Sequence, residues 1–134
     1  MNANALDILE RRSDWGATIL RFKITKPGTS YWNRPDIGIG STDVVLDRDA
    51  VRVRVHSLGG VASPGGRVVV RGRDGREIGS AGIPAMAAPS DLKPKTTDVE
   101  VHLRTGADAA GGSVAVELEQ NAEEITQRNN SIRL

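Results

Sequence analysis

Short segments in which aliphatic and charged residues alternate one by one dominate the chain from residue 49 onward. The clearest segment covers residues 49–57 and reads DAVRVRVHS, so its three valines fall on one side of an extended strand and its arginines on the other. Residues 97–104 and 113–119 repeat this pattern. A strand that is apolar on one side has to bury that side against a second layer. The alternation therefore predicts two packed sheets, and the lack of helical crossover segments excludes an open α/β fold.

Turn-forming residues separate these segments. Residues 67–73 precede Asp74-Gly75, a dipeptide that accepts the positive φ of a tight hairpin turn, and residues 76–81 predict the returning strand. Residues 82–95 contain three prolines, which lack the N–H that a sheet needs, and predict a long connection. We expect residues 125–134 to close the sheet.

These segments together predict an all-β fold with an antiparallel β-sandwich of about seven strands over residues 35–134. Residues 1–34 form an N-terminal extension or linker. Within it, residues 4–12 predict a short helix and residues 17–25 predict a strand.

Composition excludes several classes of protein. The chain of 134 residues contains no cysteine, which removes disulfides and thiolate nucleophiles. The longest apolar run is far shorter than the roughly 18 residues of a membrane span, so we expect none. The formal net charge of +1 gives no reason to expect nucleic acid as a partner.

No catalytic residues are predicted, and the chain is not expected to be an enzyme. His56 and His102 fall at outward positions of predicted strands, two histidines alone do not make a zinc site, and no Gly-x-Ser-x-Gly elbow occurs. We expect neither a metal nor a cofactor. Calcium at Asp43, Asp47 and Asp49 remains an open alternative, although their spacing matches no known calcium loop.

All four aromatic residues lie before position 33. Tyr31 and Trp32 lie in a proline-bounded segment and are the candidate binding residues, because they alone could stack on a sugar ring. We interpret them first as packing residues at the junction with a neighbouring domain.

The two ends of the body carry a family resemblance. It opens with Pro35-Asp36 before an aliphatic strand, and it closes with Glu124 and an aliphatic residue that lead into Asn129-Asn130. This pattern resembles the CARDB family, the cell-adhesion-related domains of bacteria, over most of the body. The tandem asparagines are expected to make a bend before the final strand, since asparagine tolerates the left-handed region and bonds nearby backbone.

Two departures from the family pattern occur. Gln127 stands where the family more often has a second glutamate, and residues 57–60 read SLGG in place of the usual Asn-x-Gly turn. The resemblance implies an immunoglobulin-like or fibronectin-like module without catalytic residues, attached to a larger surface or secreted protein.

The expected function is therefore that of a non-catalytic accessory module of a larger exported bacterial protein, serving adhesion, spacing or docking. Its partner would be a neighbouring domain of the same polypeptide or another copy, and its location extracellular or at the cell surface. The N-terminus lacks the features of a secretory signal, so a cytoplasmic location is expected if the chain is complete as given.

Two alternatives stay open. One is a carbohydrate-binding module that holds a polysaccharide through Tyr31 and Trp32. The other is a free-standing assembly subunit joined through its N-terminal strand, because residues 17–25 suit addition to a sheet edge.

Overall fold

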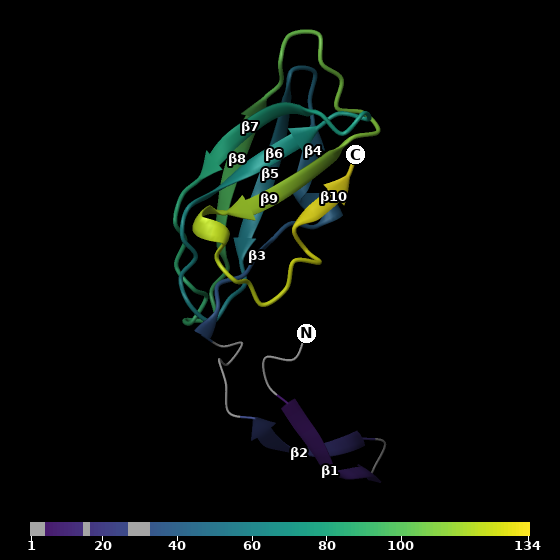
Figure 1. Ribbon diagram of the computed structural model, residues 1–134, viewed down its shortest axis with the longest axis vertical. Helices are drawn as coiled ribbons and strands as arrows, with labels where there is room; N and C mark the ends of the chain where they lie inside the picture. The colour runs from purple at the N-terminus through teal and green to yellow at the C-terminus, as the bar shows by residue number, and fades with distance from the viewer. Residues whose placement is uncertain (1–4, 15–16, 27–32) are drawn as a thin grey trace. The chain divides into compact units, whose positions relative to one another are not determined.

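Every long element of the computed structural model is a strand (Figure 1). The structure describes residues 5–14, 17–26 and 33–134, and the chain divides into two compact units between Asn33 and Arg34. Within the described ranges, the helical elements are short 3-10 turns, and no helix is long and apolar enough to cross a membrane. The predicted all-β class is confirmed.

The N-terminal unit contains a two-stranded antiparallel ribbon of β1 (Ala5–Asp14) and β2 (Ala17–Lys26). The short helix expected over residues 4–12 is therefore wrong for residues 5–12, and residue 4 lies outside the described residues. A nine-residue helix is shorter than the roughly 12–15 residues that an isolated helix needs. A hairpin instead pairs the backbone of both segments over ten residues each.

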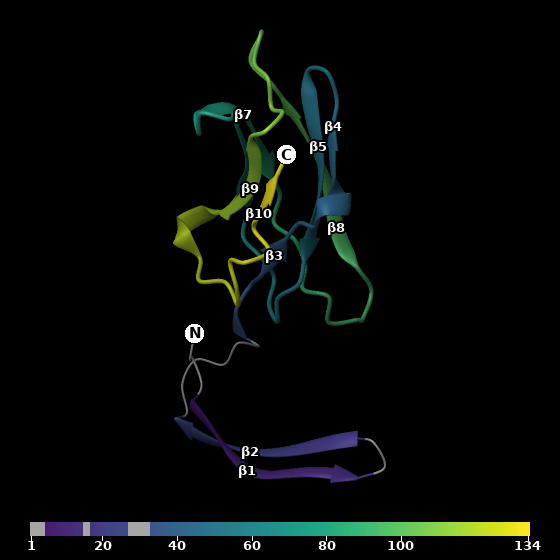
Figure 2. The same cartoon turned by 90° about the vertical axis from the view of Figure 1, so that its right-hand side faces the viewer.

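One sheet of the sandwich is built around β5 (Ala50–Ser57). The strand β8 (Lys95–His102) pairs with one edge of β5, and β3 (Ile37–Gly38) and β4 (Val44–Leu46) pair in succession with the other (Figure 2). All these pairings are antiparallel.

The edge formed by β3 and β4 is interrupted. Gly38 pairs with His56 and Val44 pairs with Val53, so the five residues 39–43 stand opposite only two residues of β5. A 3-10 turn at Ser41–Asp43 accommodates the additional residues of this edge. The two short strands therefore belong to one broken edge strand.

The second sheet has the order β10-β9-β6-β7. Its strands are β6 (Gly66–Arg71), β7 (Glu77–Ile83), β9 (Ser113–Leu118) and β10 (Ser131–Arg133). The predicted β6–β7 hairpin is present, and Gly75 at its turn has a φ of +82°. The sandwich thus has eight strands in two four-stranded antiparallel sheets.

The core between the sheets is aliphatic, with valine its commonest residue. The three valines of β5 are at most 1% exposed, whereas the two arginines between them are exposed, as the alternation predicted. The other buried aliphatic residues of the core cluster are Ile37, Ile39, Val68, Val70, Ile83, Met86, Val99, Val101, Ala109, Val114 and Val116. β-branched side chains lose little further freedom in a strand, which suits them to a core without aromatic rings.

Replacing Ile37 by alanine tests this core at the edge of the first sheet. Ile37 is fully buried, so Ile37→Ala is expected to lower the free energy of unfolding by about 2–5 kcal/mol. Urea denaturation measures the change. The control is Val45→Ala on neighbouring β4, which is 57% exposed and should change stability by less than about 0.5 kcal/mol. Equal losses in the two variants would contradict the assigned core.

Candidate functional site

The C-terminal segment of residues 124–130 runs along the free edge of β3, and we call it the C-terminal clasp. The backbone N–H of Ile125 donates to the carbonyl of Pro35 at 3.1 Å, and the N–H of Ile39 donates to the carbonyl of Asn129 at 2.8 Å. The clasp therefore satisfies backbone groups of β3 and its flanks that would otherwise lie at an open edge.

The same segment also bonds to the second sheet. The N–H of Val116 in β9 donates to the carbonyl of Asn130 at 2.8 Å. The consecutive carbonyls of Asn129 and Asn130 thus accept hydrogen bonds from the residue that follows β3 and from β9 of the second sheet. The clasp closes the sandwich between β3 and β9.

The carboxylate of Glu124 reinforces this closure. Its Oε1 accepts a hydrogen bond from the N–H of Ile37 at 3.1 Å, and its Oε2 accepts one from the Nδ2 amide of Asn130 at 2.6 Å. Glu124 is only 8% exposed, and burial raises its pKa above the usual range, partly opposed by these two hydrogen bonds. The nearby negative charge of Asp36 raises the pKa further.

Asp36 is the second buried carboxylate at the clasp. It is 5% exposed, and its Oδ2 accepts a long hydrogen bond of 3.5 Å from the Nδ2 of Asn129. Burial raises the pKa of Asp36, opposed by the hydrogen bonds from Asn129 and from the backbone of Thr126. In the described part of the chain, the donors to both carboxylates are neutral amides rather than basic side chains.

The structure brings together all five residues that the sequence analysis selected at the two ends of the body. They are Pro35, Asp36, Glu124, Asn129 and Asn130. The asparagines lie in a turn directly before β10, but the non-glycine residues with positive φ in the described chain are Leu92 and Gln120. The asparagines act instead through their carbonyls and through side-chain amides that donate to carboxylates. Tyr31 and Trp32 lie outside the described residues.

Sequence reasoning missed the backbone partners of the clasp. Ile37 lies 87 positions from the glutamate that it contacts, and no spacing motif signals such a pair. Gly38 was also missed, although a glycine in a strand often marks a close approach. A Cβ on Gly38 would lie 2.6 Å from the Nδ2 of Asn129.

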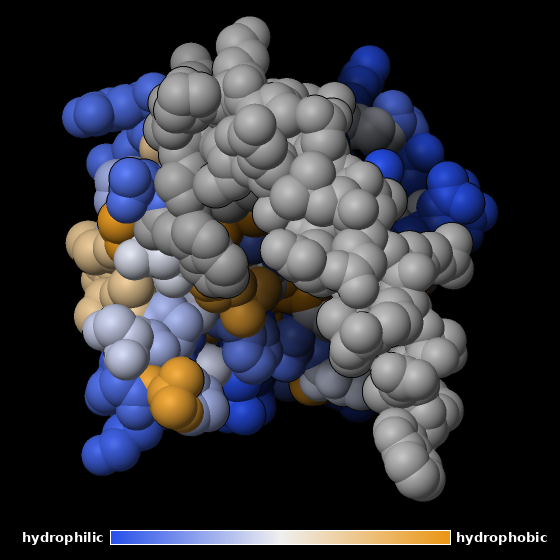
Figure 3. All heavy atoms as spheres, turned by 90° about the horizontal axis from the view of Figure 1, so that it is seen from below, coloured by the Kyte–Doolittle hydropathy of each residue, from blue (hydrophilic) through white to orange (hydrophobic). Residues whose placement is uncertain are grey.

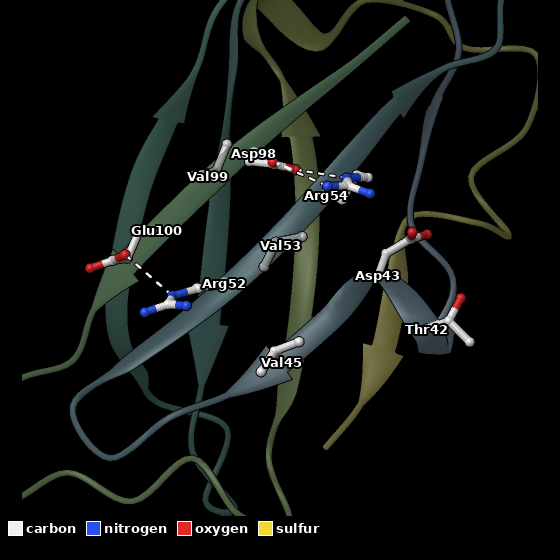
Figure 4. Close-up of a pocket in the computed structure, with 9 residues that line it drawn as sticks. All are labelled: Thr42, Asp43, Val45, Arg52, Val53, Arg54, Asp98, Val99 and Glu100. Carbon is white, nitrogen blue, oxygen red and sulfur yellow. Dashed lines mark hydrogen bonds and ion pairs between the residues drawn. The ribbon is translucent and has the colours of Figure 1, made fainter. Parts of the chain in front are cut away.

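A shallow groove of about 410 Å³ lies on the outer face of the first sheet (Figure 4). Its charged side chains on β5 and β8 pair with one another. Arg54 contacts Asp98 at 2.8 Å, and Arg52 contacts Glu100 at 3.5 Å. Exposed pairs of this kind contribute little stability, and their charges offset each other over the groove.

His56 contacts the carboxylate of Asp43, which lies in the 3-10 turn between β3 and β4. Its Nε2 lies 2.9 Å from Oδ1 of Asp43, whose Oδ2 accepts a hydrogen bond from the N–H of Gly40 at 2.7 Å. The hydrogen bond with His56 lowers the pKa of Asp43, and the Gly40 N–H adds to this effect. His102 likewise contacts a carboxylate, that of Glu100, at 3.4 Å. Both histidines thus lie beside carboxylates of the first sheet.

The three aspartates considered for calcium do not share one site. Asp43 bonds Gly40 and His56, whereas Asp47 bonds the N–H of Arg48. Over residues 5–14, 17–26 and 33–134, no group of three or more histidine, aspartate or glutamate side chains is placed to hold a metal ion.

The fold defines an antiparallel β-sandwich closed by its C-terminal segment. No family model, no curated protein and no solved structure matches the chain. The CARDB resemblance therefore rests on the sequence motifs alone.

Gly38→Ala tests the contact between β3 and the clasp. The added methyl group would displace the side chain of Asn129, so the variant should lose about 1–3 kcal/mol of stability in urea denaturation. Gly82→Ala in β7 is the matched control, because a Cβ there has no neighbour within 4 Å. It should leave stability unchanged or raise it by up to about 1 kcal/mol. A loss in the control as large as that in Gly38→Ala would contradict the contact.

Asp43→Asn tests the hydrogen-bonded pair of Asp43 and His56 at the interrupted edge of the first sheet. A carboxylate whose pKa is lowered by folding stabilises the fold at pH values above its unfolded pKa of 3.8. This contribution disappears as the pH falls through the lower pKa of the folded state. The variant should therefore be less stable than the wild type by about 0.5–1.5 kcal/mol at pH 6. The difference should shrink as the pH falls below 3.8. The control is Asp49→Asn, and a difference that does not depend on pH would contradict this role.

Proposed function

We propose that this chain is a non-catalytic docking module in which the sandwich is a scaffold and the N-terminal ribbon attaches to a neighbouring protein chain. The supporting observation is that β1 and β2 form a sheet of two strands, each paired with the other alone. A lone two-stranded ribbon is at best marginally stable in water, and a third strand or a second layer is needed for independent stability. A partner strand would supply it.

The charges of the ribbon indicate what kind of partner strand would pair with it. The register places Asp7 opposite Lys23 and Glu10 opposite Arg21, whereas the third acidic residue of β1, Asp14, lies opposite Ala17. β2 contains no acidic residue of its own. Opposite charges on adjacent strands stabilise a sheet, so a partner strand that adds to the outer edge of β2 should carry acidic residues.

The described surface of the sandwich offers less for docking. Its large exposed hydrophobic residues are Val45, Leu46, Leu58 and Leu92. Seen from below in Figure 3, the coloured surface is mainly hydrophilic, with hydrophobic residues in small separate areas. Scattered apolar residues of this kind are normal on a protein surface and do not make an interface.

The resemblance to CARDB domains supports the wider setting, that of an accessory module for adhesion, spacing or docking in a larger exported bacterial protein. The second candidate is a free-standing assembly subunit whose ribbon pairs with that of another copy, which the same open ribbon edges favour. The carbohydrate-binding alternative depends on residues outside the described chain and stays a prediction from the sequence.

Hydrogen–deuterium exchange of the full chain tests the role of the ribbon. In the isolated monomer, the amides of β1 and β2 should exchange about a hundredfold faster than those of β5, because a lone ribbon opens easily. Light scattering on the same samples gives the mass. Protection that rises with concentration together with a dimer mass would favour the assembly subunit. Strong protection of the ribbon in a monomer would contradict docking.

A photo-crosslinker at Phe22, in the full-length protein in its host, then tests the partner. The expected product joins β2 to an extended acidic segment of one protein. Reversing the three basic charges of β2 should weaken this product at least tenfold, whereas reversing three exposed arginines of the sandwich loops should not. The first set is Arg21→Glu, Lys23→Glu and Lys26→Glu, and the control set is Arg48→Glu, Arg73→Glu and Arg76→Glu. Crosslinks that are unaffected by the first set would contradict strand addition.

A further inference from the structure

The strand β8 forms one border of the first sheet. In the described part of the chain it pairs with β5 alone, so its other edge has no strand hydrogen-bonded to it. The far end of this border is closed by β7, because the N–H of Arg104 donates to the carbonyl of Ile78 at 2.9 Å. Before that point, β8 presents the open backbone edge that an added strand needs.

The outward positions of β8 carry two acidic residues, Asp98 and Glu100. Figure 4 shows them beside arginines of β5, yet their side chains remain 69% and 47% exposed. Each carboxylate oxygen can accept more than one hydrogen bond, so these contacts leave room for a basic residue on the other side of β8. Val99 and Val101 are buried. The open edge of β8 therefore alternates between exposed acidic and buried aliphatic residues.

The sequence of β2 has the complementary alternation. From Leu20 to Ile24 it reads LRFKI, so Arg21 and Lys23 share one face of the strand and the apolar residues share the other. The pairing of β2 with β1 is regular over these residues, whereas β1 has one extra residue, Leu9. Because a bulge disrupts an edge for further pairing, the outer edge of β2 is the better template.

One antiparallel register satisfies both patterns, with residues 20–24 of β2 against residues 97–101 of β8. The facing charged and apolar pairs are then Arg21 with Glu100, Phe22 with Val99 and Lys23 with Asp98. The charges of each outward row alternate in sign from β5 through β8 and β2 to β1. Opposite charges on adjacent strands stabilise a sheet. The pairing stops short of Lys26 and Lys95, which have like charges.

We propose that β2 of one copy of this chain adds to the open edge of β8 of a second copy, and that two copies exchange ribbons in this way to form a dimer. Within one chain both edges stay open, since β2 pairs with β1 alone and β8 with β5 alone. Pairing of β2 with β2 of another copy would instead bring basic residues together. Exchange in both directions closes a two-fold dimer, the commonest symmetry of protein oligomers.

This inference rests on the proposed function of the ribbon and identifies the acidic strand that it binds. The two can fail separately. If the chain stays a monomer while a crosslinker at Phe22 captures an acidic segment of another protein, the second copy is excluded as the partner and docking through β2 remains.

Disulfide mapping of the full-length chain tests the register. The chain has no cysteine, so introduced cysteines report on one pair of positions. The register places Ile24 opposite Thr97, and Ile24→Cys and Thr97→Cys keep every charge of the pairing. When the two variants are mixed with oxidised glutathione, a disulfide should form between the two chains, because facing positions of adjacent strands lie within bonding range.

Thr96→Cys is the matched control for Thr97→Cys. Thr96 shares a row with His56 on the outward face of the sheet, whereas Thr97 shares a row with the buried Val55. Although Thr96 is the more exposed of the two, mixing Ile24→Cys with Thr96→Cys should give at least tenfold less disulfide. Equal yields would overturn the register. A double variant, Ile24→Cys with Thr97→Cys, that forms its disulfide within one chain while the mixed single variants form none would overturn the second copy as partner.

Sedimentation velocity measures the dimer itself, which should form reversibly as the concentration of the wild type rises. Asp98→Asn with Glu100→Gln should raise the dissociation constant at least tenfold, because the dimer loses the charges that face β2 in both copies. The control is Glu77→Gln with Glu117→Gln, which removes two carboxylates of the second sheet that also contact arginine. It should leave the dissociation constant unchanged. A monomer at every concentration, or equal weakening in both double variants, would overturn the inference.

Discussion

The closure of the sandwich depends on the hydrogen bonds that the C-terminal clasp makes to both sheets. The carbonyl of Asn129 accepts from Ile39, directly after β3, and the carbonyl of Asn130 accepts from β9. The buried carboxylate of Glu124 connects β3 to the same turn. A sheet edge at this position would otherwise expose unpaired backbone groups. The clasp consists of residues 124–130, so this connection between the two sheets requires nearly the whole sequence.

The valine-rich core sets the requirement for this closure. Valine side chains are short and stiff, so they fill a thin layer between sheets but bury less apolar area each than aromatic residues do. Hydrogen bonds between the sheets at the sandwich edges therefore add to the stability that this core provides. The opposite edge has its own bond, in which the N–H of Arg104 donates to the carbonyl of Ile78 at 2.9 Å. Backbone contacts thus tie the sheets together on both sides of an aliphatic core.

The sequence predicts most of the sandwich because its signals are local. Alternation around Val53 predicts which side is buried, and Asp74-Gly75 predicts the hairpin turn. The helix expected near the N-terminus fails because pairing with β2, a partner outside the local window, determines the conformation. The contacts of the clasp are beyond such reasoning, since they join residues about ninety positions apart. A motif can mark Asn129 and Glu124 as important without showing which backbone groups they meet.

The 3-10 turn at Ser41–Asp43 has a consequence for how this protein meets others. It splits one border of the first sheet into strands of two and three residues, and the clasp covers the shorter of them. An incoming chain finds no straight row of donors and acceptors along this border, so uncontrolled self-association through it is suppressed. The break therefore leaves this border without the continuous row of backbone groups that an added strand needs, whereas β1 and β2 are ten residues long each.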